Sequence, residues 1–151
     1  MSSKFVYVTY IRTTPQKLWD ALTKPEFTRA YWFGVTHECD WKVGSPWKMT
    51  IPDGRVGDSG EVLEIEPLKR IVLKWRNEFR PELKLEGFTR CAFDIVQQGD
   101  MVQLKVTHES GLDNSKMIEG VSGGWPQILS SLKSLLETGK GLERTSEWPK
   151  G

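Results

Sequence analysis

Apolar residues in the last third of the chain recur at steps of three and four. The pattern runs from Ile118 through Trp125 to Leu136. This period places the apolar side chains along one stripe of an amphipathic helix. We predict a helix over residues 116–138, ended by Gly139, because glycine readily adopts the left-handed conformation of a helix C-terminus.

Pro126 lies inside this pattern. A proline in a helix interior removes one backbone hydrogen bond and clashes with the preceding turn. Either the helix begins at Pro126, or it begins near Ser115 and kinks at the Gly123–Pro126 step. The stripe stays in phase on both sides of Pro126, which favours the kinked helix.

The N-terminal part predicts one strand and two short helices. Residues Phe5–Ile11 are β-branched and aromatic, as in a strand. Thr14 before a proline predicts a helix start. A second helix is expected to begin with a capping box between Thr23 and Glu26 and to end at Gly34.

Residues between 35 and 110 alternate between apolar and polar types, with turn residues such as Pro52–Gly54 between the runs. Residues 78–86 are charged and are expected to be a loop or a frayed extension. The expected strands cover residues 35–42, 46–52, 57–66, 71–76, 90–95 and 102–109. We predict an α+β domain over residues 1–139, with six or seven antiparallel strands around the long helix, and a loosely held polar tail over residues 140–151.

Composition excludes several classes of partner. Lys plus Arg total 21 and Asp plus Glu total 20, so the net charge is +1. This balance argues against nucleic acid and against an anionic membrane surface. No apolar run is long enough to span a bilayer and the start lacks a secretory signal pattern, so a cytoplasmic location is expected. Cys39 and Cys91 are isolated, which is typical of buried thiols.

The order of elements resembles the helix-grip fold of the SRPBCC superfamily, which includes START and birch-pollen-allergen-like domains. Within it, the chain is similar to the branch of homologues of the activator of the heat-shock-protein ATPase. The resemblance rests on residues 14–22, 25–34, 60–67, 73–75, 106–109 and 124–137. It implies a cavity between the sheet and the C-terminal helix. It does not define a function, because the superfamily hosts carriers, cyclases and hydrolases.

Seven Trp residues are unusual for 151 residues. Large aromatic rings with a few polar groups are typical of sites for apolar ligands, although each ring on its own is as well explained as core. The predicted ligand-binding residues are Trp32, Phe33, Trp47, Met49, Trp75, Phe79, Phe88, His108, Trp125 and Leu129.

Three polar residues have an ambiguous role. His108 ends an apolar strand face and should point toward the helix, where a hydrogen-bonded core histidine is the commoner arrangement. The facing of His37 and Glu64 cannot be read from the sequence. An inward Glu64 would be a buried acid in need of a partner, and so a polar anchor or an acid–base group.

The leading hypothesis is a non-catalytic binder or carrier of a small hydrophobic molecule, lipid-like or polycyclic. One alternative is a hydrolase or cyclase in the same cavity, with His108 or Glu64 as its base. Another is an interaction module that regulates a chaperone ATPase, which the branch name suggests and which we rank last. We expect no metal, no cofactor and no catalytic triad, and a homodimer is possible.

Overall fold

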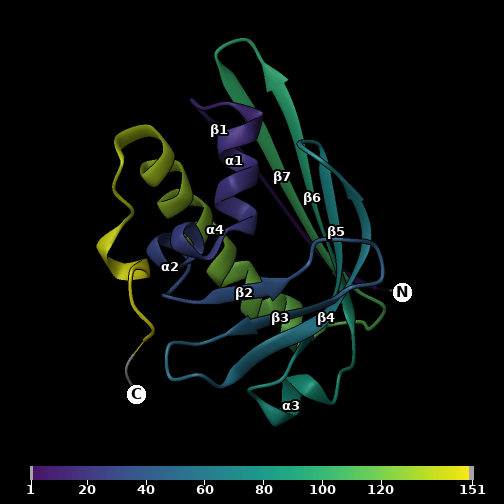
Figure 1. Cartoon of the computed structure of the whole chain (residues 1–151). Coiled ribbons are helices and arrows are strands. Elements are labelled where there is room, and N and C mark those ends of the chain that lie inside the picture. Colours follow the sequence, from purple (N-terminus) through teal and green to yellow (C-terminus); the bar gives the residue numbers. More distant parts are fainter. Residues whose placement is uncertain (1, 150–151) are drawn as a thin grey trace.

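The long helix lies against one antiparallel sheet (Figure 1). The apolar stripe of this helix is buried. The structure is a computed structural model that describes residues 2–149. The strands in this range are β1 (Ser3–Ile11), β2 (Thr36–Cys39), β3 (Pro46–Thr50), β4 (Val56–Glu66), β5 (Arg70–Asn77), β6 (Thr89–Gln98) and β7 (Met101–Ser110). The helices are α1 (Pro15–Thr23), α2 (Pro25–Tyr31), α3 (Pro81–Lys84) and α4 (Lys116–Thr138), followed by the 3-10 turn η1 (Glu143–Thr145).

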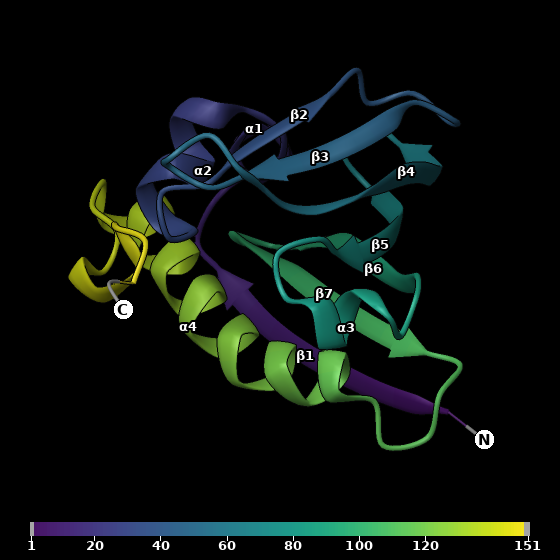
Figure 2. The same cartoon turned by 90° about the horizontal axis from the view of Figure 1, so that it is seen from below.

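The order of strands in the sheet is β1-β7-β6-β5-β4-β3-β2. Neighbours in the chain are neighbours in the sheet from β2 to β7, and β1 closes onto β7 at the far edge. Helix α4 runs along β1, and α1 and α2 lie at one end of the sheet (Figure 2). This is the α+β helix-grip arrangement that the sequence predicts.

Both ends of α4 follow the predicted signals. Ser115 is the N-cap, and its Oγ accepts a hydrogen bond from the backbone N–H of Ile118 at 3.1 Å. Gly139 ends the helix in the left-handed region, with φ at 86°. The helix therefore begins near Ser115 as favoured, and Pro126 lies inside it.

Of the two helix caps predicted before α1 and α2, the first is confirmed and the second is wrong. Thr14 caps α1, and its Oγ1 accepts a hydrogen bond from the N–H of Lys17 at 3.2 Å. The capping box predicted at Thr23 is wrong, because the N-cap of α2 is Lys24, without a side-chain cap. The Thr23 hydroxyl instead donates to the carbonyl of Trp19 inside the last turn of α1.

Residues 78–86 contain a short helix instead of the expected loop. Asn77 Oδ1 accepts hydrogen bonds from the N–H groups of Phe79 and Arg80, and α3 follows at once. Proline at the first helical position suits this start. Leu83 is buried, so α3 contributes to the core.

A β-bulge in β4 decides the facing of its side chains. Val62 pairs with Leu73 and Glu64 pairs with Val72, so Leu63 is the extra residue. Val62 is buried, whereas the side chain of Glu64 is 54% exposed and pairs with Arg70 and Arg90. The hypothesis of an inward Glu64 is therefore wrong.

The C-terminal segment is attached to the body of the protein over residues 140–149. The N–H of Leu142 donates to Ser131 Oγ at 2.9 Å, and the N–H of Phe33 donates to the carbonyl of Thr145 at 2.7 Å. Thr145 is buried. The tail was expected to be loosely held, and these contacts correct that expectation for its described part.

Candidate functional site

An aromatic cluster fills the centre of the space between the sheet and α4. Its neighbouring ring centroids lie 4.4 to 6.2 Å apart, which is the range of favourable aromatic contacts. The members are Trp32, Trp47, Trp75, Trp125, His37 and His108. The interior is therefore more solid than a hollow lined by separate indoles.

Gly60 explains how two of these indoles meet. Gly60 pairs with Trp47 on one side and with Trp75 on the other. A Cβ on Gly60 would lie 1.7 Å from the carbonyl oxygen of Lys74, so no side chain fits there. The two indoles approach each other across the glycine to 4.4 Å between centroids.

His108 is held by a chain of hydrogen bonds. Trp125 Nε1–H donates to His108 Nδ1 at 3.2 Å, and His108 Nε2 lies 2.8 Å from Thr89 Oγ1. The Thr89 hydroxyl donates to the carbonyl of Trp75 at 2.9 Å, so it must accept from Nε2–H. We therefore assign the neutral Nε2–H tautomer. Burial lowers the pKa of His108 to about 3, which keeps it neutral at physiological pH.

His37, whose facing the sequence left open, points into the same cluster. Its Nδ1 accepts from Trp47 Nε1–H at 3.0 Å. Its Nε2 is buried without a hydrogen-bond partner among the described residues. Burial lowers the pKa of His37 to about 3 as well. Both histidines thus act as acceptors that orient an indole.

A cavity of about 250 Å³ lies beside this cluster, between α3, the sheet and the first half of α4. Figure 2 shows α3 beside the first turns of α4. The Glu86 carboxylate joins the two elements, since it accepts hydrogen bonds from Ser115 Oγ at 2.6 Å and from the N–H of Lys116 at 2.8 Å. The cavity is lined by Trp32, Met49, Asp58, Trp75, Asn77, Arg80, Leu83, Met117, Gly120, Val121, Gly124, Trp125 and Ile128.

Asp58 is the acid of this cavity. It lies on β4 and is only 6% exposed. Its Oδ1 and the nearby Trp75 Nε1 are both buried, and neither has a hydrogen-bond partner of normal geometry among residues 2–149. Burial raises the pKa of Asp58 to about 7, and the Trp75 and Asn77 side chains partly oppose that rise. The carboxyl therefore titrates near neutral pH.

The ten predicted site residues lie in four places. Trp32, Met49, Trp75 and Trp125 line the cavity. Trp47, His108 and Leu129 are fully enclosed behind it. Phe33 packs at the margin of the core. Phe79 and Phe88 are 38% and 42% exposed and lie outside the cavity.

Phe79 and Phe88 contact other side chains outside the cavity. The Phe79 ring meets Trp148 edge to face at 6.0 Å, with the Arg55 guanidinium 4.7 Å from its centroid. Phe88 lies on the outer face of the sheet under Lys74 and Arg76.

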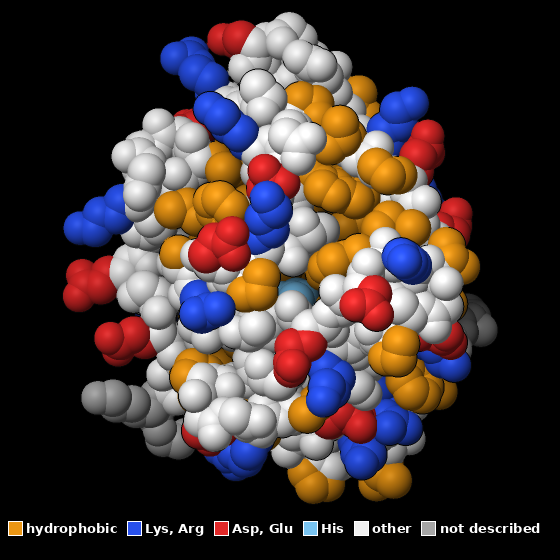
Figure 3. All heavy atoms as spheres, viewed as in Figure 1, with side chains coloured by type: hydrophobic (Ala, Val, Ile, Leu, Met, Phe, Trp, Pro, Cys, Tyr) orange, Lys and Arg blue, Asp and Glu red, His pale blue; other side chains and the backbone are white. Residues whose placement is uncertain are grey.

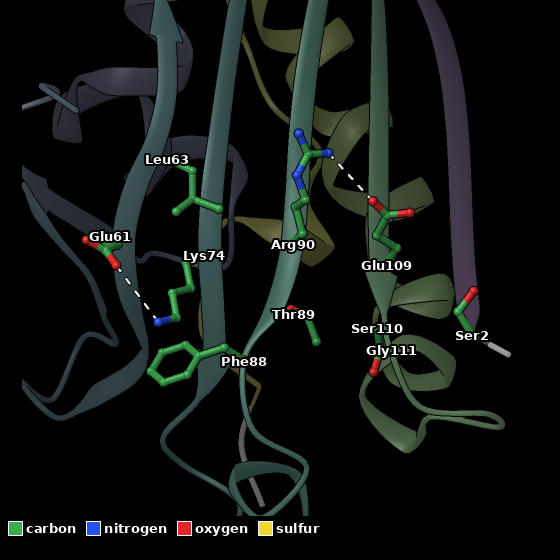
Figure 4. A pocket seen from close by; sticks show the side chains of 10 residues that line it. All are labelled: Ser2, Glu61, Leu63, Lys74, Phe88, Thr89, Arg90, Glu109, Ser110 and Gly111. Carbon is green, nitrogen blue, oxygen red and sulfur yellow. Dashed lines mark ion pairs between the residues drawn. The ribbon is translucent and has the colours of Figure 1, made fainter. Parts of the chain in front are cut away.

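A wider groove of about 560 Å³ crosses that outer face (Figure 4). Its charged side chains pair across the strands, Glu61 with Lys74 and Arg90 with Glu109. Because these ions already have partners and solvent around them, the groove is a solvated surface. The inner cavity, with its unpaired carboxyl, is the better candidate site.

Acidic and basic side chains are interspersed on the face shown in Figure 3, beside a band of apolar side chains near α1. Among residues 2–149, no cluster of three or more His, Cys, Asp or Glu side chains could hold a metal ion. No helix in this range is long and apolar enough to cross a membrane.

Asp58, Asn77 and the glycines of α4 were not predicted from the sequence. A signal for Asp58 was present, because Asp58, Gly60 and the apolar Val62 alternate along one strand face. Gly120 and Gly124 lie four apart on a single helix face, next to the apolar stripe. A Cβ atom added at either glycine would have no neighbouring atom within 4 Å. Glycines that leave such space can mark a cavity wall.

The sheet, the long helix and the cavity between them define a helix-grip protein of the SRPBCC superfamily. Residues 12–137 match the family described as Activator of Hsp90 ATPase homolog 1-like protein. The chain belongs to this family, which confirms the resemblance seen in the sequence. A search of curated proteins found no match.

Solved structures with the same fold include the following three. The Aha1 dimer from Colwellia psychrerythraea is 21% identical with a TM-score of 0.74, and the match covers 92% of this chain and 99% of that one. Protein MLL2253 from Mesorhizobium loti is 26% identical with a TM-score of 0.74, over 89% and 96% of the two chains. CalU16 from Micromonospora echinospora is 18% identical with a TM-score of 0.70, over 98% and 69%.

Proposed function

We propose that the protein binds a small, largely apolar molecule in the cavity between α4 and the sheet. The observation that carries this proposal is the cavity of about 250 Å³ lined by three indoles and one buried carboxyl. Apolar walls with a few polar groups are typical of small-molecule sites. The size of the cavity favours a ligand smaller than the lipid or polycycle expected from the sequence.

Volume sets the scale of the ligand. Sites for drug-sized molecules occupy about 300–1,000 Å³, whereas a cavity of about 150 Å³ accommodates benzene. A cavity of 250 Å³ therefore suits one or two rings with a short substituent. Burial of one Phe-sized group contributes about 1.5–3 kcal/mol before association costs. We expect dissociation constants in the range of about 10 µM to 1 mM.

A leucine at Gly124 tests the site. Gly124 lines the cavity, and a Cβ there meets no atom within 4 Å, so Gly124→Leu should fill the space without disturbing the helix. Leucine is also the better helix former. We expect at least a tenfold loss of affinity for one-ring and two-ring aromatic compounds. The change in tryptophan fluorescence on titration with each compound measures this affinity.

Gly123→Leu is the matched control. Gly123 is exposed, has the same open space and does not line the cavity. It should bind like the parent protein. Equal binding by the parent protein and both variants, or no binding by the parent protein to any such compound, contradicts the proposal.

Catalysis in the same cavity is a second candidate function, and Asp58 is the residue that favours it. Asp58 lines the cavity and its pKa of about 7 suits an acid–base group. His108 does not line the cavity, and both of its ring nitrogens are engaged. Turnover that survives Asp58→Asn would exclude this role.

A homodimer is a further proposal, supported by the dimeric state of the Colwellia structure. Val6, Val8 and Tyr10 form an exposed apolar row on the edge strand β1, which is where we place the contact. Sedimentation of a monomer at all concentrations would contradict it. Regulation of a chaperone ATPase stays a prediction, and a pull-down with purified bacterial Hsp90 tests it.

A further inference from the structure

We propose that the cavity selects a small organic cation, an amine or quaternary ammonium carried by a ring, with Asp58 as its counter-ion. This inference rests on the proposed function, because it assigns a ligand class to the same cavity. Three observations support it: the charge of the lining, the type of its walls and the state of the groups around Asp58.

The charge inside the cavity is that of Asp58. The other charged residue in the lining is Arg80, whose side chain is 61% exposed and whose Nε donates to Glu82 Oε1 at 2.8 Å. Arg80 therefore lies at the mouth and already has a partner. Asp58 is only 6% exposed, and its Oδ1 lacks a hydrogen bond of normal geometry among residues 2–149. The donors near its carboxyl, the side chains of Trp75 and Asn77, are neutral. A buried carboxylate without a counter-charge is stabilised when a cation reaches it.

The walls suit the same charge. Trp32 follows the end of α2, Trp75 comes from β5 and Trp125 comes from α4, and the three indoles meet at the cavity. An indole ring attracts a cation by about 0.5–2 kcal/mol, and groups of aromatic rings recognise quaternary ammonium ions in this way. A neutral apolar ligand would gain from the indoles by burial alone. It would leave the carboxyl of Asp58 without a counter-charge.

The groups packed around Asp58 do not supply a cation of their own. Met49 faces it from β3, and α4 presents Gly120, Val121 and Gly124 to the cavity. From the other side, Glu78 adds a negative charge that raises the pKa of Asp58. Glu78 is itself paired with Arg76 at 2.6 Å and with Lys84 at 3.8 Å, so those two cations are engaged outside the cavity. A ligand must bring the missing positive charge.

A pair of probes with nearly the same shape tests the inference. Phenyltrimethylammonium carries a permanent charge, and tert-butylbenzene is its neutral counterpart. At pH 8, where Asp58 is ionised, we expect the cation to bind at least tenfold more tightly, as measured by tryptophan fluorescence. Affinity for the cation should fall as the pH is lowered from 8 to 5, approaching tenfold per pH unit below about 7, because protonation of Asp58 removes the counter-ion.

Two variants of the same chemistry complete the test. Asp58→Asn should abolish both the preference for the cation and its pH dependence. Asp113→Asn makes the same charge change in an exposed loop and should preserve both. The near-ultraviolet circular dichroism of each variant shows whether the tryptophan cluster is intact.

The outcomes separate the two proposals. Equal binding of both probes, or tighter binding of tert-butylbenzene, with loss of that binding in Gly124→Leu, overturns the cation inference and leaves the cavity as a binding site. Tighter cation binding that persists in Asp58→Asn also overturns it. Binding of neither probe to the parent protein counts against both proposals.

Discussion

At the scale of single residues, Thr89 determines how the histidine and the indoles of the core are arranged. Its hydroxyl accepts from His108 and donates to the carbonyl of Trp75, so one oxygen joins β5, β6 and β7. Trp125 is fixed in turn by the other ring nitrogen of His108. The imidazole of His108 accepts one hydrogen bond at Nδ1 and donates one at Nε2, which is the pattern of its neutral form.

Removal of the Thr89 hydroxyl should therefore be costly. Thr89→Val has the same shape, but it leaves His108 Nε2–H and the Trp75 carbonyl without their partner. We expect a loss of about 1–3 kcal/mol in the free energy of unfolding, measured by urea denaturation. Thr107→Val on the outer face of β7 is the control and should change stability by less than about 0.5 kcal/mol. Equal effects of the two substitutions would contradict this account.

Part of the lining of the candidate cavity could be predicted from the sequence at this scale. Trp32, Met49, Trp75 and Trp125 lie at the cavity because strand alternation and helix period both reflect burial. The facing of Glu64 could not be predicted, because one extra residue at Leu63 reverses the facing of everything beyond it in β4. A bulge depends on how β4 pairs with β5, and that pairing is not visible in a local pattern.

At the scale of elements, the small helix α3 forms one wall of the cavity and is held to α4 through Glu86. The carboxylate of Glu86 accepts from Ser115 Oγ and from two backbone N–H groups, those of Lys116 and Met117. A negative charge at this end of a helix is stabilising, because the unsatisfied N–H groups of the first turn are partially positive.

Glu86→Ala should release α3 from α4. We expect the free energy of unfolding to fall by about 1–3 kcal/mol. Amide hydrogen exchange should become faster than in the parent protein, and the increase should be largest in residues 81–87. Glu82→Ala removes an acid within α3 whose partner Arg80 is exposed, and it should cost less than about 1 kcal/mol. Unchanged exchange in residues 81–87 of Glu86→Ala would show that this anchor is unimportant.

Long elements, in which the apolar pattern repeats many times, were predicted well, and short elements were not. Helix α4 and the alternating strands repeat a pattern many times, so single exceptions such as Pro126 do not hide it. Helix α3 has four residues, too few for a period, and the turn before it is held by the Asn77 side chain. The tail is attached by backbone groups of Leu142 and Thr145, which leave no trace in side-chain polarity.

At the scale of the whole molecule, three buried ionisable groups set the response to pH. His37 and His108 have pKa values near 3 in the folded protein and about 6.5 when unfolded. The unfolded chain therefore binds two more protons than the folded one between these values, and stability is lost as the pH falls below about 6.5. Asp58 has the opposite sign, because its folded pKa of about 7 lies above its ordinary value of 3.8.

Between pH 6.5 and 4, the two histidines and Asp58 together make the unfolded chain bind about one more proton than the folded protein. We expect the free energy of unfolding to fall by about 1.4 kcal/mol per pH unit over this window, measured by urea denaturation. In Asp58→Asn the opposing group is gone, so the fall should be about twice as steep. A parent protein whose stability does not change from pH 7 to 4 would contradict the burial of the two histidines.

The global arrangement was the most predictable feature, since one long helix and a series of strands allow few ways to bury both faces. The size of the cavity was the least predictable. Its volume depends on how far Trp32, Trp47, Trp75 and Trp125 pack against each other, which is decided by Gly60 and by the two histidines. The composition alone could not distinguish indoles that surround a space from indoles that fill it.

The place of β1 beside β7 has a consequence for synthesis of the chain. Residues Ser3–Ile11 find their neighbour only when Met101–Ser110 has left the ribosome. Until then, an aromatic and β-branched strand remains without hydrogen-bonding partners, which is the condition in which nascent chains associate wrongly. Contacts so distant in sequence also slow the search for the native topology. Chains arrested before residue 101 should be cleaved readily by protease and captured by holdases.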